Sequence, residues 1–173
     1  MRDVTLTQGQ VALVPDGDHD WLSSSKWYAK WNSYTKSFYA FSAVPTGLEH
    51  PKQQWIRMHN AIWEHHNGPI PVGRTVDHVG HDTLDNRLSN LRLATNSQQA
   101  QNRRLRTDNK SGYRGVHWHK ATGKWTASIQ VNGKRMHLGL FTDKIEAARA
   151  YDAAAAIHHD PAFVQFNFPE EHQ

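Results

Sequence analysis

Short apolar runs in the first third of the chain alternate with polar positions, and many of their members are aromatic. This pattern predicts β-strands, because a strand turns successive side chains to opposite faces of a sheet. A turn-forming stretch of proline, aspartate and glycine at residues 15–18 ends the first run. The predicted strands are residues 11–14, 27–29, 38–41 and 55–58.

The next segment changes from strand to helix periodicity. Ile62 and Trp63 follow Met58 at helical spacing, so a short helix is expected over residues 59–66. An asparagine, a glycine and a proline then stop it. Beyond this stop, the sequence predicts a strand at 72–78, a polar loop at 80–90 and a short strand at 91–93.

A second helix is predicted after these strands. Thr95 and Gln98, three residues later, fit a capping box, so a helix is expected to begin there and to run to about Arg106. The polar residues 107–112 are interpreted as a linker and as the boundary between two domains.

The last third of the chain has the clearest pattern. Asn132-Gly133 is a strong hairpin signal between two strand-length segments. Asp143 and Glu146 form another capping box, from which an alanine-rich helical face runs to near His159. The predicted strands are residues 113–118, 124–131 and 135–140. The expected fold class is therefore α+β, with an N-terminal β-rich segment and, at the end, a three-stranded antiparallel sheet backed by one helix.

Composition narrows the range of functions. The chain has 173 residues, no cysteine and 38% apolar residues, below the usual ~45–50%. The lack of cysteine excludes disulfides and cysteine-ligated zinc, and it fits a reducing compartment. No apolar run approaches the ~20 residues of a membrane span, and no signal peptide is recognisable. We expect a soluble protein without a membrane partner or a small-molecule substrate.

The net charge of +4 is unevenly distributed. Residues 1–58 are nearly neutral, whereas the segment from Arg87 to Arg114 is basic and contains one acid, Asp108. A solvated helix face is one explanation. The glutamine- and asparagine-rich residues 96–102 favour another, because such side chains hydrogen-bond phosphates and bases. The 13 histidines also exceed what an ordinary core needs.

Asp77 and His78 stand together near the end of a predicted strand, before Gly80. A one-metal phosphodiesterase needs a carboxylate that holds a divalent cation and a base that activates water. Adjacent strand residues point to opposite faces, so both roles are compatible only where the strand ends and twists. From spacing alone, such a pair is more often a surface hydrogen bond.

Longer motifs around this pair resemble those of the HNH homing endonucleases of phages. The motifs are Val76-Asp77-His78, the run from Leu84 to Thr95, and the stretches from Met58 to Trp63 and from Asn67 to Pro71. The resemblance covers about residues 55–105 and implies a ββα-metal core of two strands, a long loop and a helix. It implies that Asp77 is a metal ligand and that His78 is the general base. It also implies that Asn90 orients the histidine and fixes the loop.

One position departs from the family pattern. The helix usually supplies a histidine or asparagine as second ligand where this chain has Gln99, and Asn96 and Asn102 on the same helix are alternatives. Hard oxygen ligands favour one divalent cation per chain, Mg²⁺ or Mn²⁺. A zinc cluster is a further alternative, although histidines at a helix end are also favoured by the helix dipole. Its candidate ligands are His59, His65, His66 and His81.

A second resemblance covers nearly all of residues 111–169. Its motifs run from Ser111 to Val116, Gly123 to Ile129, Leu138 to Phe141, Glu146 to Ala154 and Asn167 to Pro169. They are similar to the DNA-binding domain of plant ethylene-response factors, the APETALA type, which lays its sheet in the DNA major groove. The side chains expected to contact DNA are Arg103, Arg104, Arg114, His117, His119, Lys124, Trp125, Ser128, Gln130, Arg135 and His137. Several plant contact residues differ here, so the target sequence does not carry over.

Together these features predict a metal-dependent DNA endonuclease whose partner is double-stranded DNA. The expected organisation is an accessory β-rich segment 1–54, an HNH core 55–106, the linker 107–112 and a DNA-binding domain 113–169. One metal site per chain predicts nicking by a monomer, with the oligomeric state open between monomer and dimer. The alternative is a weakened or inactive relic that acts as a sequence-specific DNA-binding regulator. The resemblance implies the cytoplasm of a bacterial host cell as its location.

Overall fold

The computed structural model describes residues 2–172. The chain divides into two compact units, Met1–Ala94 and Thr95–Gln173, and each unit is described on its own. Both units combine helices with small antiparallel sheets, which confirms the predicted α+β class. No helix in the described part of the chain is long and apolar enough to cross a membrane.

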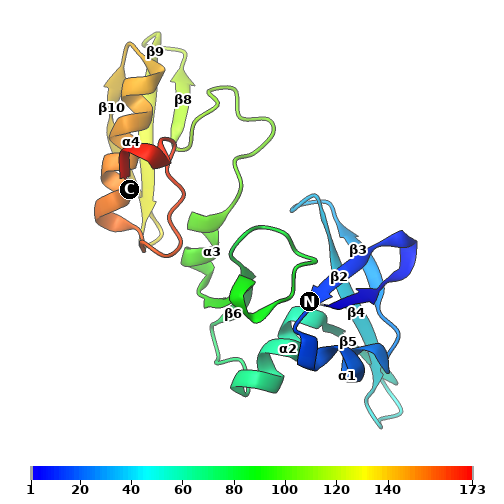
Figure 1. The fold of residues 1–173 in the computed structure, drawn as a ribbon. Helices are drawn as coiled ribbons and strands as arrows, with labels where there is room; N and C mark the ends of the chain where they lie inside the picture. Colours follow the sequence, from blue (N-terminus) through cyan, green and yellow to red (C-terminus); the bar gives the residue numbers. More distant parts are fainter. Residues whose placement is uncertain (1, 173) are drawn as a thin grey trace. The chain divides into compact units, whose positions relative to one another are not determined.

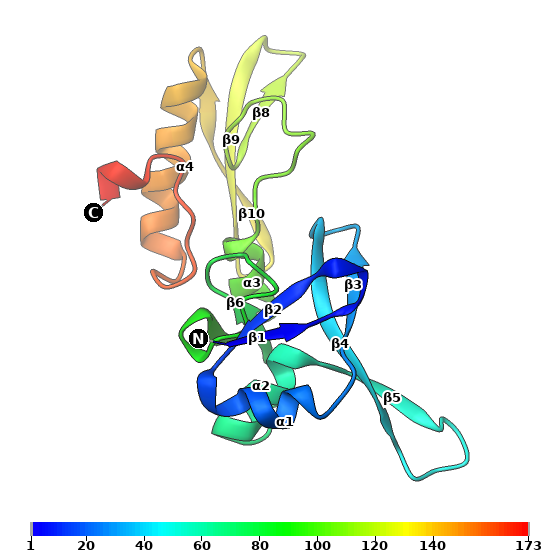
Figure 2. The same ribbon diagram turned by 45° about the vertical axis from the view of Figure 1, so that its right-hand side comes forward.

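The first unit is built from short strands and two α-helices. Its strands are β1 Arg2–Thr5, β2 Val11–Val14, β3 Tyr28–Asn32, β4 Ser37–Pro45, β5 Gln53–Arg57, β6 Thr75–His78 and β7 Leu91–Ala94. Its helices are α1 His19–Ser23 and α2 Met58–Asn67, with 3-10 turns at Thr7–Gly9, Asp16–Asp18 and Leu88–Asn90. The antiparallel sheets pair β1 with β2, β3 with β4 and β5, and β6 with β7 (Figure 1, Figure 2).

A single hydrophobic core joins the N-terminal strands to the elements that follow them. Val14 of β2, Leu22 of α1 and Ile62 of α2 are fully buried in this core. Val76 of β6 and Leu91 of β7 belong to the same cluster. Each such side chain stabilises the fold by about 1.5–3 kcal/mol when it leaves water. The N-terminal strands therefore help to hold β6 and β7 in place.

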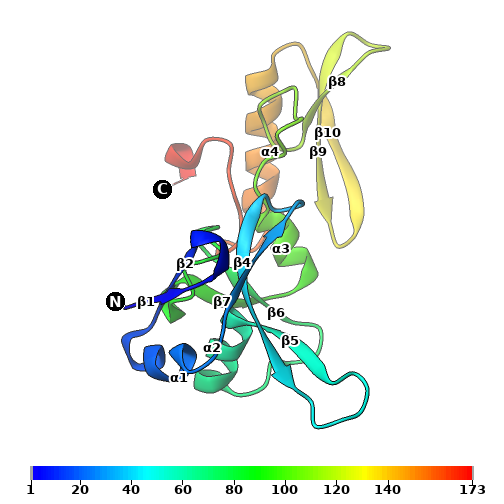
Figure 3. The ribbon, with the colours of Figure 1, turned by 90° about the vertical axis from the view of Figure 1, so that its right-hand side faces the viewer.

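The β6–β7 pair is the framework of the candidate site. Figure 3 shows it beside α2. Strand β6 begins at Thr75, three residues later than the predicted start at residue 72. The reason is a turn in which Gly73 adopts a left-handed φ of 79° and the Arg74 amide donates to the Pro71 carbonyl at 3.0 Å.

The second unit contains the predicted three-stranded sheet and its helix. Its elements are α3 Asn96–Asn102, β8 Val116–His119, β9 Lys124–Val131, β10 Lys134–Phe141, α4 Lys144–His158 and a 3-10 turn at Pro169–His172. The sheet order is β10-β9-β8, and α4 lies along one face of it (Figure 1). Ala147, Ala148 and Ala155 are fully buried, because small side chains let the helix approach the sheet closely. The Asp143 carboxylate caps α4 by accepting from the Ile145 and Glu146 amides, as predicted.

A glycine explains why β8 is shorter than predicted. Gly115 adopts a left-handed φ of 68°, which ends extended structure before Val116. A Cβ at this position would lie 2.0 Å from Cδ2 of Tyr151 and 2.6 Å from the Ser128 carbonyl oxygen. Only glycine therefore permits the loop before β8 to approach α4 and β9 this closely.

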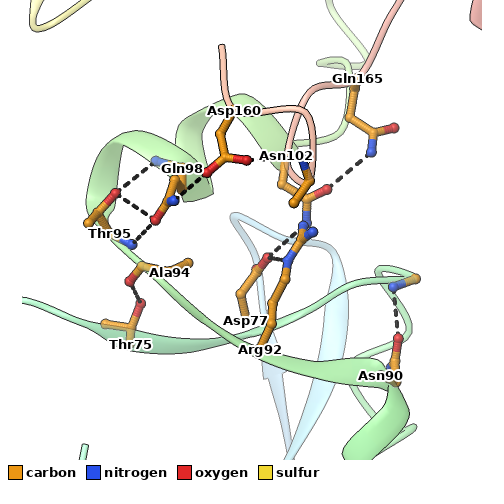
Figure 4. A network of polar contacts seen from close by, with 12 residues as sticks. Thr75, Asp77, Asn90, Arg92, Ala94, Thr95, Gln98, Asn102, Asp160 and Gln165 are labelled. Atoms are coloured by element: carbon orange, nitrogen blue, oxygen red, sulfur yellow. Dashed lines mark hydrogen bonds and ion pairs between the residues drawn. The ribbon is translucent and has the colours of Figure 1, made fainter. Parts of the chain in front are cut away.

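Helix α3 is attached to the C-terminal segment of its own unit. The Thr95–Gln98 capping box is present, and the Gln98 amide group also donates to the Asp160 carboxylate at 2.8 Å (Figure 4). The helix ends at Asn102, before the predicted Arg106, and the chain leaves it in extended conformation at Arg103. Helical continuation would have placed like charges of the arginine cluster near one another. The chain divides into its two units between residues 94 and 95, so this helix belongs to the second unit. The predicted domain boundary at 107–112 stays a prediction.

Candidate active site

Strand β6 places Asp77 and His78 on opposite faces of the β6–β7 pair. Asp77 is opposite Arg92 and His78 is opposite Leu91 in the antiparallel register. The Asp77 side chain is part-exposed, whereas His78 is only 5% exposed. The two candidate functional groups thus have different surroundings although they are neighbours in sequence.

His78 lies in a buried polar pocket of the first unit. Its Nε2 is 3.3 Å from Oδ1 of Asn86, and its ring centroid is 4.8 Å from that of His59 and 6.2 Å from that of Tyr39. Burial lowers the pKa of His78 below 6.5, although the Asn86 hydrogen bond and nearby carboxylates act in the opposite direction. His78 is therefore neutral at pH 7, which is the form that a general base needs.

His59 supports this arrangement from the first turn of α2. It is 2% exposed, and its ring meets the His78 ring edge-on at 80°. Burial lowers the pKa of His59 well below 6.5, and the adjacent His78 adds to the effect because two positive charges would repel each other. The fold thus holds two neutral imidazoles in contact.

Asp77 makes an ion pair across the two strands. Nη2 of Arg92 is 3.2 Å from Oδ2 of Asp77, and Nε of the same arginine is 3.3 Å away (Figure 4). Both side chains are more than four-fifths shielded from solvent. The ion pair holds the carboxylate toward β7, and a cation bound at Asp77 would share it with Arg92.

Asn90 fixes the loop between the two strands. Its Oδ1 accepts from the Gly80 amide at 2.8 Å (Figure 4). Its Nδ2 donates to the carbonyls of Asp85 at 2.8 Å and Asp82 at 3.3 Å. These bonds join both ends of the loop, which is the loop-fixing part of the role that the resemblance implied. His78 has a side-chain contact with Asn86, four residues before Asn90 in the same loop.

Strands β2 and β4 of the first unit also hold this loop. The Leu13 amide of β2 donates to the Leu84 carbonyl at 2.9 Å, and the Asn86 amide donates to the Leu13 carbonyl at 2.9 Å. The Thr83 hydroxyl donates to the Phe38 carbonyl of β4. Because Asn86 in turn contacts His78, strand β2 is connected to the candidate base through one residue.

The candidate helix ligands are on α3, in the second unit. Gln99 is half-buried, and its side-chain amide makes no hydrogen bond within the described residues. Asn96 is exposed, while Asn102 is 2% exposed and its Oδ1 accepts from Gln165 at 3.2 Å (Figure 4). Gln99 and Asn96 therefore have amide oxygens available to a ligand, whereas the Asn102 oxygen is already used.

Most of the predicted DNA contacts share the face of the β8–β10 sheet that lies away from α4. The register aligns His117 with Thr126, His119 with Lys124, and Arg135 with Gln130. Alternation along the strands puts these side chains on the same face, opposite the buried Ala127 and Ile129. The members of this face among the candidates are His117, His119, Lys124, Ser128, Gln130, Arg135 and His137, all exposed except the buried Ser128.

Trp125 differs from the other candidates on the sheet. It packs against the buried cluster of Val116, Ala127, Ala147 and Ala148, and its ring lies 5.0 Å from that of Trp118. These contacts put the Trp125 side chain on the helix-facing side. Its position favours packing, and we leave it out of the proposed DNA-contacting face.

The arginine candidates have distinct surroundings. Arg103 and Arg104 are exposed in the extended segment after α3. Arg114 is part-buried beside Tyr151 and Asp152, and its amide donates to Oδ1 of Asn167 at 2.7 Å. Burial lowers the pKa of Arg114 from its ordinary value, but a guanidinium remains charged in proteins. Arg114 thus supplies positive charge from a well-anchored backbone.

Three residues of the pocket were not identified by residue-by-residue reasoning. Asn86 and His59 lie inside the motifs that carry the family resemblance, but no role was predicted for Asn86, and His59 was predicted only as one of four alternative zinc ligands. Tyr39 stands in a strand with ordinary aromatic alternation, and nothing in its local sequence distinguishes it. Only the tertiary fold brings it to His78.

Comparisons with known proteins agree with both predicted resemblances. A family model described as HNH endonuclease matches residues 57–101. Protein 3.8 of Escherichia phage T7 is 37% identical over 79 residues, which cover 46% of this chain and 65% of that protein. An APETALA2-like protein 2 of Oryza sativa is 49% identical over 45 residues, which cover 26% of this chain and 10% of the plant protein. The plant match therefore covers only a short part of a much longer protein.

A longer match extends across both units. An uncharacterized HNH endonuclease of Acanthamoeba polyphaga mimivirus is 30% identical over 149 residues, which cover 86% of this chain and 70% of that protein. The match includes the strand pair with Asp77 and His78 and continues well beyond it. The chain belongs to the HNH endonuclease family.

Proposed function

We propose that the protein is a metal-dependent DNA endonuclease of the homing type, and that it hydrolyses a phosphodiester bond at a site held by its C-terminal unit. The observation that carries this proposal is the state of His78. It is a buried, neutral imidazole, held by Asn86 and adjacent to an acidic residue, within the segment that matches the HNH endonucleases. A buried, neutral histidine suits the role of general base, whereas a surface hydrogen bond between Asp77 and His78 would leave the histidine exposed.

The hydrogen bond to Asn86 selects the reactive nitrogen. When Nε2–H of His78 donates to Oδ1 of Asn86, the basic lone pair is on Nδ1, and Nδ1 accepts the proton of the attacking water. The imidazolium that results is stabilised by the same bond and by the carboxylates of Asp77, Asp82 and Asp85, which favour the charged form. Burial opposes this charge and so returns His78 to its neutral state after turnover.

The donor set suits a hard divalent cation. The Asp77 carboxylate and the Gln99 amide carbonyl are oxygen ligands of the kind that Mg²⁺ and Mn²⁺ prefer. When bound, such a cation would neutralise charge that develops on the phosphate. Arg92 holds the Asp77 carboxylate in place, and its own charge can contact the same phosphate.

The sheet of the second unit supplies the hold on DNA in this proposal. The face away from α4 carries Lys124 and Arg135 for phosphates or guanine, with exposed histidines and Gln130 between them. A sheet of this size fits the major groove of B-form DNA but not the deep, narrow groove of A-form RNA. Since each chain has one such nuclease site, a monomer should nick one strand.

The test uses the full chain and a supercoiled plasmid that carries phage-like DNA. With Mg²⁺ or Mn²⁺ we expect nicked product, which should disappear with a chelator and in His78→Ala. His50→Ala, which removes an exposed histidine of the same unit, is the matched control and should cut like the wild type. Equal traces of product from wild type and His78→Ala would refute the nuclease proposal.

The second candidate function is a DNA-binding regulator that evolved from a nuclease. The observation in its favour is the Asp77–Arg92 ion pair, because the positive charge of Arg92 would repel a metal ion bound at Asp77. In addition, this chain has Gln99 where the family helix usually supplies a histidine or asparagine ligand. In this case the wild type would bind DNA without cutting it. Cleavage gained by Gln99→Asn would then identify the glutamine as the change that silenced the site.

A further inference from the structure

Three potential metal ligands lie together in the first unit, away from the β6–β7 pair. Asp18 precedes α1, and His65 and His66 are in the last turn of α2. One ligand atom from each residue lies within 4.8 Å of the others. These two histidines are among the four candidate zinc ligands predicted from the sequence, with His59 and His81. Nothing in the sequence indicates that Asp18, 47 residues before His65, would join them.

We propose that Asp18, His65 and His66 bind one transition-metal ion of the zinc type. Two imidazoles and one carboxylate are the donor set that suits Zn²⁺, with a water molecule as fourth ligand. Asp77 and Gln99, in contrast, are oxygen donors that suit Mg²⁺. The two sites would therefore differ in metal as well as in position, and this proposal does not depend on the nuclease chemistry.

The carboxylate of this site is already held in position. Asp18 is 2% exposed, and its Oδ1 accepts from Nε1 of Trp21 at 3.1 Å. Nε2 of His66 is 3.0 Å from Oδ1 and 2.9 Å from Oδ2 of Asp18. Metal sites are stabilised when an outer hydrogen bond fixes the orientation of a ligand, as Trp21 does here. An ion bound by His66 and Asp18 would take the place of the hydrogen bonds between them.

His65 is the residue that a simple hydrogen-bonded pair leaves unexplained. Its ring centroid is 5.1 Å from that of Trp21 and 5.1 Å from that of His66. His65 therefore packs beside the two residues that contact the Asp18 carboxylate. Ligand atoms around tetrahedral zinc lie about 3.4 Å apart, given zinc–ligand distances of about 2.0–2.2 Å. The exposed His65 side chain would rotate to bring its nitrogen from the present spacing, within 4.8 Å, to that distance.

The surroundings favour a cation at this position. The last turn of α2 directs the negative end of the helix dipole toward the ion. His65 and His66 are exposed, which leaves a path for the ion to enter. A bound metal would join the start of α1 to the end of α2, the helix that positions His59 beside His78. Its expected role is to stabilise the first unit.

The experiment titrates the metal-free full chain with Co²⁺ and follows the visible absorption of the bound ion. We expect saturation at one equivalent per chain, displacement by Zn²⁺, and a rise in Tm with added Zn²⁺, because an ion that binds only the folded state stabilises it. His65→Ala should weaken Co²⁺ binding at least tenfold. His158→Ala removes an exposed histidine from the last turn of α4 and should leave binding unchanged.

Two further variants keep the result unambiguous. Asp18→Asn retains an oxygen that can accept from Trp21, so it should fold but lose most of the affinity for Co²⁺. Asp77→Ala should retain the whole cobalt signal, because it changes only the candidate magnesium site. Equal cobalt spectra from wild type and His65→Ala would overturn the proposal, as would the absence of saturable binding in the wild type.

Discussion

Replacing His59 by phenylalanine should make the folding stability of the first unit less dependent on pH. The imidazole is 2% exposed and in contact with His78, and burial keeps both rings neutral in the fold. The unfolded chain has no such constraint, so its histidines become protonated below their ordinary pKa of ~6.5. Phenylalanine keeps the ring contact with His78 but cannot bind a proton.

The sign and size of the effect follow from proton linkage. Below pH ~6.5 the unfolded state binds more protons than the folded state, so the free energy of unfolding decreases as the pH falls. Each neutral buried histidine contributes a slope of at most about 1.4 kcal/mol per pH unit. His59 and His78 together contribute at most about 2.7 kcal/mol per pH unit, and His59→Phe should remove the share of His59, at most about 1.4 kcal/mol per pH unit. Well above pH ~6.5 neither residue contributes a slope, because the unfolded histidines are then neutral as well.

Urea unfolding at several pH values between 5 and 8 provides the measurement. Five of the seven tryptophans, among them the buried Trp27, are in the first unit, so tryptophan fluorescence reports mainly the unfolding of that unit. Carboxylates also titrate in acid, and the comparison between variant and wild type cancels their contribution. His50→Gln, which changes an exposed histidine in a loop of the same unit, should keep the wild-type slope.

The slope between pH 6.5 and 5.5 decides the outcome. If His59→Phe shows the wild-type slope there, His59 is protonated in the folded protein, and the argument for a neutral imidazole pair fails. A uniform loss of stability at all pH values would instead report only imperfect packing of the phenylalanine, and the slope would still give the answer.

Three other substitutions test separate contacts. Gly115→Ala should destabilise the second unit by about 2–4 kcal/mol in urea unfolding, because a left-handed residue gains a Cβ that overlaps Tyr151. Asp152→Ala should cost that unit about 3–5 kcal/mol, since it removes the acceptor of the Asn167 and Phe168 amides, each at 2.9 Å; the loss should appear in its thermal transition. Asn90→Ala should speed hydrogen exchange at the Gly80 amide and reduce nicking activity, while an unchanged exchange rate would contradict its loop-fixing role.

Periodicity predicted the regular elements of the second unit well because its local signals agree with one another. The Asn132-Gly133 turn has positive φ at both residues and joins β9 to β10 in the predicted hairpin. The cap at Asp143 begins α4 as expected. Each of these features depends on a few neighbouring residues, so the sequence contains all the information that is needed.

The first unit was less predictable because its short elements depend on distant contacts. Strand β1 and helix α1 were not predicted, and each has only four or five residues. Their apolar members Val4 and Leu22 are buried against residues far along the chain. A strand of four residues has no stable periodicity of its own, and its partner β2 decides its conformation.

The difference between local signals and distant contacts also explains why the number of histidines could not reveal their individual roles. Thirteen histidines suggested chemistry, but a count does not say which imidazole is charged. Burial sets that property: it lowers the pKa of His59 and His78, whereas His65 and His66 remain exposed beside Asp18. A buried neutral pair suits proton transfer, and an exposed pair beside a fixed carboxylate suits a metal ion. Helix α2 contributes to both environments: its first turn carries the buried His59, and its last turn carries the exposed His65 and His66, so the two proposed chemistries share one helix of ten residues.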